Sequence, residues 1–192
     1  ENMEKGAHFA GLASKKAEKA GALKDAVAYA RKAVACLEKL PPRRDILRRI
    51  VDIKTKVGLC LAEMIHFEEA LNEIKPMAGL AKTLDYPRPL PKIYTISGAY
   101  NFFVREDFPL AMEDLERSIR LSVQMGDAGS LVLAQTDLGV AQAFCCDFKR
   151  ARTSLEQALE RCLPYDSLWG ISLGKSNLSL FGYNWEGRLE GG

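Results

Sequence analysis

Histidine is scarce in this sequence, so most of the side-chain chemistry that depends on it is missing. The 192 residues include only two histidines, His8 and His66. His66 follows Cys60 by six residues, a spacing that does not suit a tetrahedral metal site and brings no further ligand with it. With so little histidine, neither a Ser/His/Asp nor a Cys/His catalytic arrangement can be assembled. We therefore expect no catalytic residue, no metal site, no cofactor and no enzymatic activity in this chain.

Long apolar runs and an excess of one charge are also missing. No stretch approaches the roughly 18 apolar residues of a membrane span, and the segment from Glu1 to Lys19 is too charged for a secretory signal. A formal net charge of +2, with basic and acidic residues interspersed, argues against a nucleic-acid partner. One basic cluster lies beside Asp45 and Asp52, where we favour a solvated helix start over an anion or partner site; it comprises Arg43, Arg44, Arg48 and Arg49.

The five cysteines are an odd number, and each falls in an apolar, periodic stretch: Cys36, Cys60, Cys145, Cys146 and Cys162. This pattern is typical of reduced, buried thiols and not of a disulfide framework, so it predicts a reducing compartment and a cytoplasmic protein. Neighbouring side chains on a helix point about 100° apart. For the adjacent Cys145 and Cys146 we therefore favour buried packing or the edge of a turn over redox chemistry.

Four alanines mark an internal repeat, with spacings of 44, 41 and 40 residues: Ala26, Ala70, Ala111 and Ala151. A large apolar residue stands three positions before each alanine: Leu23, Phe67, Phe108 and Phe148. A small residue stands twelve positions before each: Ser14, Gly58, Ala99 and Gly139. Further apolar or small residues follow four and seven positions after the alanines. Offsets of 3, 4 and 7 place these residues on one helix face, and the small residue predicts a close crossing with the preceding helix.

The breaks between these segments predict helical hairpins. A short polar break precedes each alanine segment, and longer breaks rich in proline or glycine separate one unit from the next. A single hairpin cannot bury its apolar face, so the units must stack. We expect about nine helices in antiparallel pairs and no sheet, with repeats at 5–42, 44–86, 90–126 and 129–164 and a partial fifth at 166–192. Residues 1–192 then form one repeat domain, which we expect to be a fragment of a longer protein.

The segment LGVAQAFCCDFKRARTSLEQALE, from Leu138 to Glu160, resembles the tetratricopeptide repeat (TPR) family, with Gly139, Phe148, Ala151 and Ala158 in family positions. The period of 40 to 44 residues is that of its longer-period branch, since the standard repeat has 34. The resemblance covers nearly the whole chain. It implies an all-α, TPR-like α-solenoid, wound as a right-handed superhelix of antiparallel helical hairpins.

The segment from Lys15 to Pro42 resembles the start of the TPR region in large bacterial signalling proteins, which carry an adenylate or guanylate cyclase or a kinase domain and then an AAA/STAND-type ATPase. This implies a scaffold or regulatory arm that binds a protein, a peptide or a sister domain of the same polypeptide. No GxxxxGK[ST] sequence is present to hold phosphates. The alternative is a small-molecule-sensing helical repeat domain that controls an attached cyclase, ATPase or DNA-binding domain; a charged pocket would favour it, whereas an apolar groove favours the scaffold.

The concave face of this fold is lined by the first helix of each pair, where we expect a partner-binding groove: Ile93, Ile96, Tyr100, Phe103, Leu133, Thr136 and Val140. Exposed apolar stretches of this kind mark interaction sites, and internal packing is the alternative. Chaperone-tail-binding members of the family grip a terminal carboxylate with Lys, Asn and Arg. That sub-function is not expected, because the matching places hold Thr55, Leu59, Ser97 and Asn101.

Pro76 stands inside the second helix of the second repeat. Its ring clashes with the carbonyl of Asn72 and it has no N–H to donate, so we expect a kink or a local break there.

Overall fold

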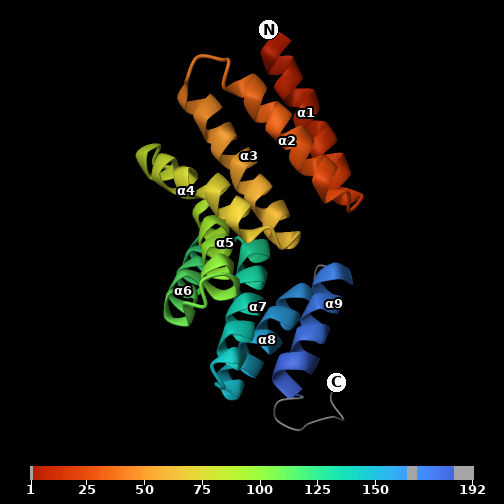
Figure 1. Cartoon of the computed structure of the whole chain (residues 1–192), viewed down its shortest axis with the longest axis vertical. Coiled ribbons are helices and arrows are strands. Elements are labelled where there is room, and N and C mark those ends of the chain that lie inside the picture. Colours follow the sequence, from red (N-terminus) through yellow and green to blue (C-terminus); the bar gives the residue numbers. More distant parts are fainter. Residues whose placement is uncertain (1, 164–167, 184–192) are drawn as a thin grey trace. The chain divides into compact units, whose positions relative to one another are not determined.

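The structure, a computed structural model, describes residues 2–163 and 168–183. The described residues contain no strand, which confirms the predicted all-α solenoid fold (Figure 1). Their helices, with the predicted antiparallel hairpins as consecutive pairs, are α1 (Asn2–Lys19), α2 (Leu23–Leu37), α3 (Arg44–Glu63), α4 (Phe67–Thr83), α5 (Leu90–Phe103), α6 (Phe108–Met125), α7 (Ala128–Phe144), α8 (Phe148–Cys162) and α9 (Leu168–Asn177), followed by the π-helix η2 (Leu178–Tyr183).

The helices form two compact units, residues 1–96 and 97–192, and the boundary falls inside α5. The first four pairs span 2–37, 44–83, 90–125 and 128–162, beside the predicted repeats 5–42, 44–86, 90–126 and 129–164. α9 and η2 lie within the predicted fifth repeat, of which residues 166, 167 and 184–192 fall outside the described residues. The single repeat domain and the right-handed superhelix stay predictions.

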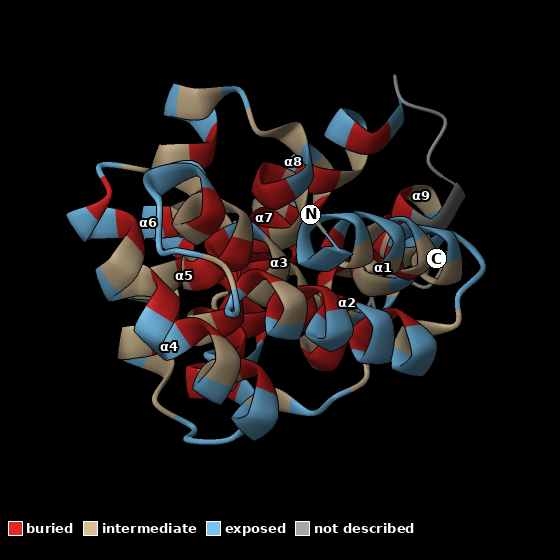
Figure 2. Cartoon of the chain, turned by 90° about the horizontal axis from the view of Figure 1, so that it is seen from above, coloured by how far each residue is buried: buried red, intermediate tan, exposed pale blue. Residues whose placement is uncertain are grey.

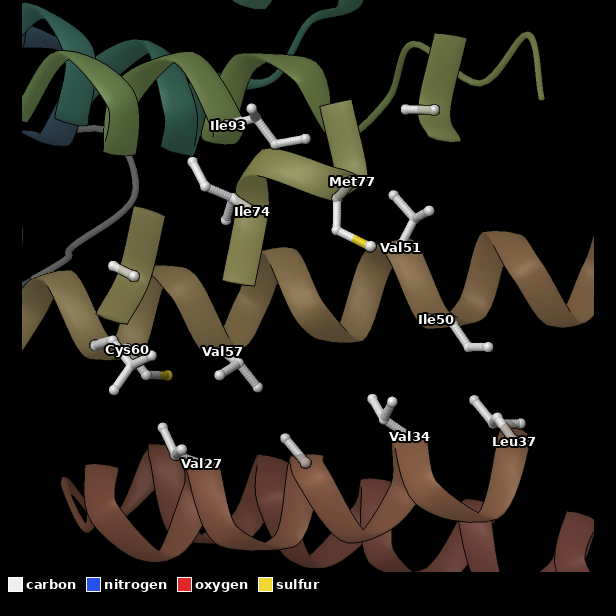
Figure 3. Close-up of a cluster of buried hydrophobic side chains, with 14 of the residues drawn as sticks. Val27, Val34, Leu37, Ile50, Val51, Val57, Cys60, Ile74, Met77 and Ile93 are labelled. Atoms are coloured by element: carbon white, nitrogen blue, oxygen red, sulfur yellow. The ribbon is translucent and has the colours of Figure 1, made fainter. Parts of the chain in front are cut away.

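The core of the first unit forms on both sides of α3. Val34 and Leu37 of α2 point toward the face of α3 that carries Ile50 and Val57, as Figure 3 shows. The opposite face of α3 meets side chains from α4 and α5: Ile74, Met77 and Ile93. Buried residues likewise gather on the sides of the helices that meet a neighbour, whereas the outer turns are exposed (Figure 2). The second helix of each of the first four pairs thus buries the anchor alanine and the residues four and seven positions after it, as the repeat pattern predicts.

The small residue of each repeat lies where its two helices cross most closely. Ser14 donates from its hydroxyl to the carbonyl of Ala26 at 2.9 Å. A β-carbon on Gly58 or Gly139 would stand within 3.5 Å of the carbonyl of the anchor alanine. In the third repeat, however, Gly98 and not Ala99 occupies this place. The α5–α6 turn is one residue longer than the other intra-repeat turns, so the crossing falls thirteen residues before the anchor.

The turns within the repeats share a left-handed residue, five positions before the anchor alanine. Gly21, Ile65, Glu106 and Cys146 occupy it, with φ between 53° and 72°. This conformation reverses the chain after the first helix of each pair. Only the first repeat has glycine there, so the other three turns hold a side chain in a region that L-residues avoid.

Local features of the sequence account for several helix ends. Asp107, Asp127 and Asp147 precede α6, α7 and α8, and each accepts from a backbone N–H in the first turn at 3.1 to 3.3 Å. Helix α4 runs from Phe67 to Thr83 with Pro76 inside it. The predicted local break at this proline does not occur, and the alternative, a kink, stays a prediction.

Candidate functional site

The predicted groove begins with Ile93 and Ile96, and the structure places both in the core of the first unit. They are 3% and 1% exposed, and a β-carbon on Gly58 would meet Ile96 Cδ1 at 3.3 Å. The face of α5 that carries them packs on the preceding helical pair. The prediction that they line an open groove is therefore wrong, and the alternative of internal packing holds for these two residues.

The groove residues of the second unit are divided between core and surface. Thr136 and Val140 are buried; Thr136 donates to the carbonyl of Val132, and Val140 packs in a cluster with Phe102 and Ala141. They too are wrongly predicted as open groove positions. Tyr100 and Leu133 are half-buried, and Phe103 is 52% exposed. A partner-binding role for Tyr100, Phe103 and Leu133 stays a prediction.

Phe103 belongs to an exposed apolar edge of the second unit, which we call the aromatic rim: Phe103, Val104 and Phe144. These residues lie where α5 and α7 end, and they are 52%, 39% and 52% exposed. The buried ring of Phe102 holds the two exposed rings in edge-on contact, with centroids 4.5 Å from Phe103 and 5.2 Å from Phe144. Phe144 was not among the predicted groove residues, and it is the last residue of α7.

A pocket of about 330 Å³ lies in the first unit between α1 and α3. We call it the α1–α3 pocket. It is lined by Ala7, His8, Gly11, Leu12, Ser14, Lys15, Ala30, Arg49, Asp52, Ile53 and Lys56. Three lining side chains are cationic and one is a carboxylate, so the lining carries an excess of positive charge. The repeat pattern could not predict this pocket. The positions that recur between repeats are those packed against a neighbouring helix, whereas the pocket is lined mostly by positions outside that pattern.

The residues at the carboxylate-gripping places of chaperone-tail-binding domains are engaged elsewhere. Ser97 and Asn101 both donate to Asp114, at 2.6 and 3.0 Å, and Thr55 is buried. Burial raises the pKa of Asp114, although these two hydrogen bonds act in the opposite direction. These polar groups therefore tie α5 to α6 and do not form an open carboxylate-binding site.

The basic cluster caps a helix. Arg44 and Arg48 donate to the carbonyl of Leu84 at the end of α4, at 2.5 and 3.5 Å. The Arg48 guanidinium also lies 5.0 Å from the centre of the Tyr86 ring. Cations are favourable at this end of a helix, where carbonyls have no partner within the helix. The sequence suggested either a solvated helix start or an anion or partner site. It did not predict that two of these arginines would bind the carbonyl end of another helix.

Burial was expected for all five cysteines, but it differs among them, and Cys36 of α2 is only half-buried. Cys60 and Cys162 are buried, and burial raises the pKa of the Cys60 thiol to about 11, which keeps it protonated and unreactive. Cys145 and Cys146 are exposed in the α7–α8 turn, as expected for the edge of a turn and not for buried packing. Within residues 2–163 and 168–183, no three His, Cys, Asp or Glu residues cluster as a metal site would require. No helix of this part is long and apolar enough to span a bilayer.

Solved structures share this fold at low sequence identity. The apo form of RapI aligns over 97% of this chain and 66% of its own, with a TM-score of 0.74 and 14% identity. Aspartyl phosphate phosphatase F from Bacillus subtilis aligns over 100% and 49%, with a TM-score of 0.72 and 14% identity. BtubC from P. vanneervenii aligns over 98% and 86%, with a TM-score of 0.64 and 13% identity.

The chain thus spans less than two thirds of the first two structures, RapI and aspartyl phosphate phosphatase F. Both are TPR-like helical-repeat proteins, and the likeness shows that this chain has a TPR-like fold. No protein-family model matches the sequence, and no curated protein matches it.

Proposed function

We propose that this chain is a non-catalytic protein-interaction scaffold, the TPR-like regulatory arm of a cytoplasmic, bacterial multidomain signalling protein. The observation that carries this proposal is the aromatic rim, where Phe103 and Phe144 are each 52% exposed. Large aromatic side chains are enriched at the centres of protein interfaces, and they account for much of the binding energy there. The fold also supports this proposal, because stacked helical hairpins form extended surfaces that bind partners.

The rim is built to bind without rearrangement. Phe103 and Phe144 both contact the buried ring of Phe102, and Phe144 also lies 5.8 Å from Phe181 between ring centres. Side chains held in this way lose little conformational freedom when a partner covers them. The partner that this surface suits is an apolar segment of another protein or of a sister domain.

Enzymatic activity is not part of the proposal. Aspartyl phosphate phosphatase F is named for a reaction, but this chain spans only 49% of it at 14% identity. Here the two histidines, His8 and His66, are both exposed and lie in the first unit. Neither belongs to a group of three His, Cys, Asp or Glu residues that could hold a metal ion in the described part of the chain.

Selection of peptides from a random displayed library against the immobilised chain tests the proposal. We expect enriched peptides with apolar or aromatic residues, and we expect Phe103→Ser and Phe144→Ser each to weaken their binding by about tenfold or more, as for an aromatic hot spot. The matched control is Val123→Ser, because Val123 is 61% exposed on α6 and lies outside the rim. Equal loss of binding in Val123→Ser, or no loss in either rim variant, would contradict the proposal.

A further inference from the structure

The α1–α3 pocket is hollow because α1 presents only small residues to its floor. Ala7, Gly11 and Ser14 follow one another at spacings of four and three, so they share one face of α1. A β-carbon on Gly11 would meet nothing within 4 Å. The volume of about 330 Å³ is at the lower end of the range found for small-ligand sites.

The two walls of the pocket repeat one chemical pattern. On α3, Arg49 and Lys56 stand seven residues apart with Ile53 between them. On α1, His8 and Lys15 stand seven residues apart with Leu12 between them. Seven residues of helix span about 10 Å and return to the same face. Each wall therefore has an apolar centre with a nitrogen-bearing side chain at either end.

The two walls run in the same direction, so their ends coincide. Glu4, near the start of α1, lies 4.0 Å from Arg49, and Glu18, near its end, pairs with Lys56. His8 therefore lies at the Arg49 end of the pocket, and Lys15 lies at the Lys56 end. The pocket has a cationic side chain at each end, about 10 Å apart, with Leu12 and Ile53 in between.

The positive charge of the lining is only partly compensated. Lys15 has no hydrogen-bond or ion-pair partner in the described part of the chain. The carboxylate 4.0 Å from Arg49 belongs to a half-exposed Glu4, and contacts of this kind are weak in water. Both oxygens of Asp52, the one acidic lining residue, accept from the Tyr86 hydroxyl at 3.0 and 2.9 Å.

We propose that the α1–α3 pocket binds a ligand that carries two carboxylates about 10 Å apart, joined by an apolar segment. One carboxylate meets Arg49 and His8, the other meets Lys15 and Lys56, and the apolar segment covers Leu12 and Ile53. Both a free dicarboxylic acid and a helical peptide with acidic residues seven positions apart have this chemistry, since seven residues of helix span about 10 Å and return to the same face. The proposal concerns the first unit and does not depend on the aromatic rim of the second.

Calorimetric titration of the whole chain with decanedioate at low ionic strength tests the pocket. Butanedioate is too short to reach both ends and decanoate has one carboxylate, so we expect each to bind about tenfold more weakly. A blocked helical peptide with two glutamates seven positions apart and a leucine between them on the same face forms the second arm. Binding of either long diacid supports the pocket, and the tighter of the two identifies the source of the ligand. Added salt should weaken the binding, because the contacts are between charges.

Two pairs of variants place the binding in the pocket. Lys15→Gln should weaken decanedioate or peptide binding by about tenfold, whereas Lys16→Gln, an equal charge change on the next exposed residue, should leave it unchanged. Gly11→Leu should fill the hollow and abolish binding. Gly79→Leu is its control, since a β-carbon at Gly79 also meets nothing within 4 Å but lies on α4. No heat with either long diacid, or equal effects within each pair, would overturn the proposal.

Discussion

Gly139 of α7 lies directly against Leu155 of α8: a β-carbon at position 139 would stand 2.7 Å from Leu155 Cγ. The same relationship joins Gly98 to Leu115 at 2.7 Å, and Gly58 to Ile74 at 2.5 Å. In each pair the large residue is the fourth after the anchor alanine, and it fills the space that the missing side chain leaves. The repeat is therefore a packing unit in which a large residue on one helix requires a glycine on the other.

Gly139→Ala should overpack this crossing. The added β-carbon would also lie 3.1 Å from the carbonyl of Ala151, which belongs to the backbone and does not yield easily. We expect a loss of about 1–3 kcal/mol in the free energy of unfolding, measured by urea denaturation. Gly79→Ala, on an open helix face, should instead gain up to about 1 kcal/mol from helix propensity. Equal midpoints for the two variants would show that the crossing is looser than described.

Ile65→Gly should stabilise the protein. Ile65 has a φ of 65° in the α3–α4 turn, and its side chain is 78% exposed, so little burial is lost on truncation. Relief of the left-handed strain exceeds the entropy that glycine adds to the unfolded chain, and we expect a gain of about 0.5–1 kcal/mol in thermal or urea unfolding. The reverse change, Gly21→Ala at a φ of 72°, should cost a similar amount. A loss of stability in Ile65→Gly would mean that the exposed isoleucine makes favourable contacts.

Arg44→Ala should weaken the end of α4. The guanidinium donates to the Leu84 carbonyl at 2.5 Å, and its removal leaves this acceptor short of a partner, at a cost of about 1–2 kcal/mol. Arg43→Ala removes the same charge from the same cluster, but Arg43 makes only exposed ion pairs at 3.4 and 4.0 Å. Its effect on denaturant midpoints should stay within about 0.5 kcal/mol. Equal losses in the two variants would argue against the cap.

Asp137 should make the stability of the chain depend on pH. Burial raises the pKa of its carboxyl to about 7 in the folded protein, whereas the unfolded value is about 4. The folded state then holds the proton more tightly, so the free energy of unfolding should fall as pH rises from about 4 to 7 and stay low above that. Asp137→Asn should remove this part of the pH dependence and stabilise the protein at pH 8 by about 1–3 kcal/mol.

Denaturant unfolding at pH 5 and pH 8 measures this difference. The comparison with wild type is necessary, because burial also raises the pKa values of Glu63 and Asp114 and these groups act in the same direction. Glu116→Gln is a suitable control, since the Glu116 side chain is 57% exposed beside Arg120. If Asp137→Asn and Glu116→Gln both keep the pH profile of the wild type, the carboxyl of Asp137 is solvated and the prediction is wrong.

The helical repeat was predictable because its signals are local. The anchor Ala151, the preceding Phe148 and the small Gly139 lie within one hairpin, where helical periodicity alone decides which face is buried. The predicted crossing residue of the third repeat, Ala99, was wrong by one position. A constant offset of twelve residues before the anchor alanine assumes that all turns within the repeats have the same length. The structure puts Gly98 at the crossing because the α5–α6 turn has one extra residue.

The candidate sites were predicted poorly, for a different physical reason. Ile93 and Ile96 share a helix face with Tyr100 and Phe103. Helical periodicity predicts which residues lie on the same face, but not whether another helix covers that face. Whether that face is covered depends on the neighbouring pair, and α3 and α4 cover only the N-terminal part of α5. Nothing in the spacing of the sequence distinguishes its covered end from its exposed end.

The sequence by itself determined the class of fold, the pairing of helices and the position of most turns, because each depends on residues within about one repeat of one another. The tertiary structure alone decided which apolar residues remain exposed at Phe103 and Phe144, and which charges gather around the α1–α3 pocket. Arg49 and Lys15 are 34 residues apart in the chain, and they line one pocket only because hairpin stacking sets α1 beside α3. Whether an apolar side chain is exposed, and which charged side chains lie close together, depends on how neighbouring repeats pack. The sequence of a single repeat does not determine that packing.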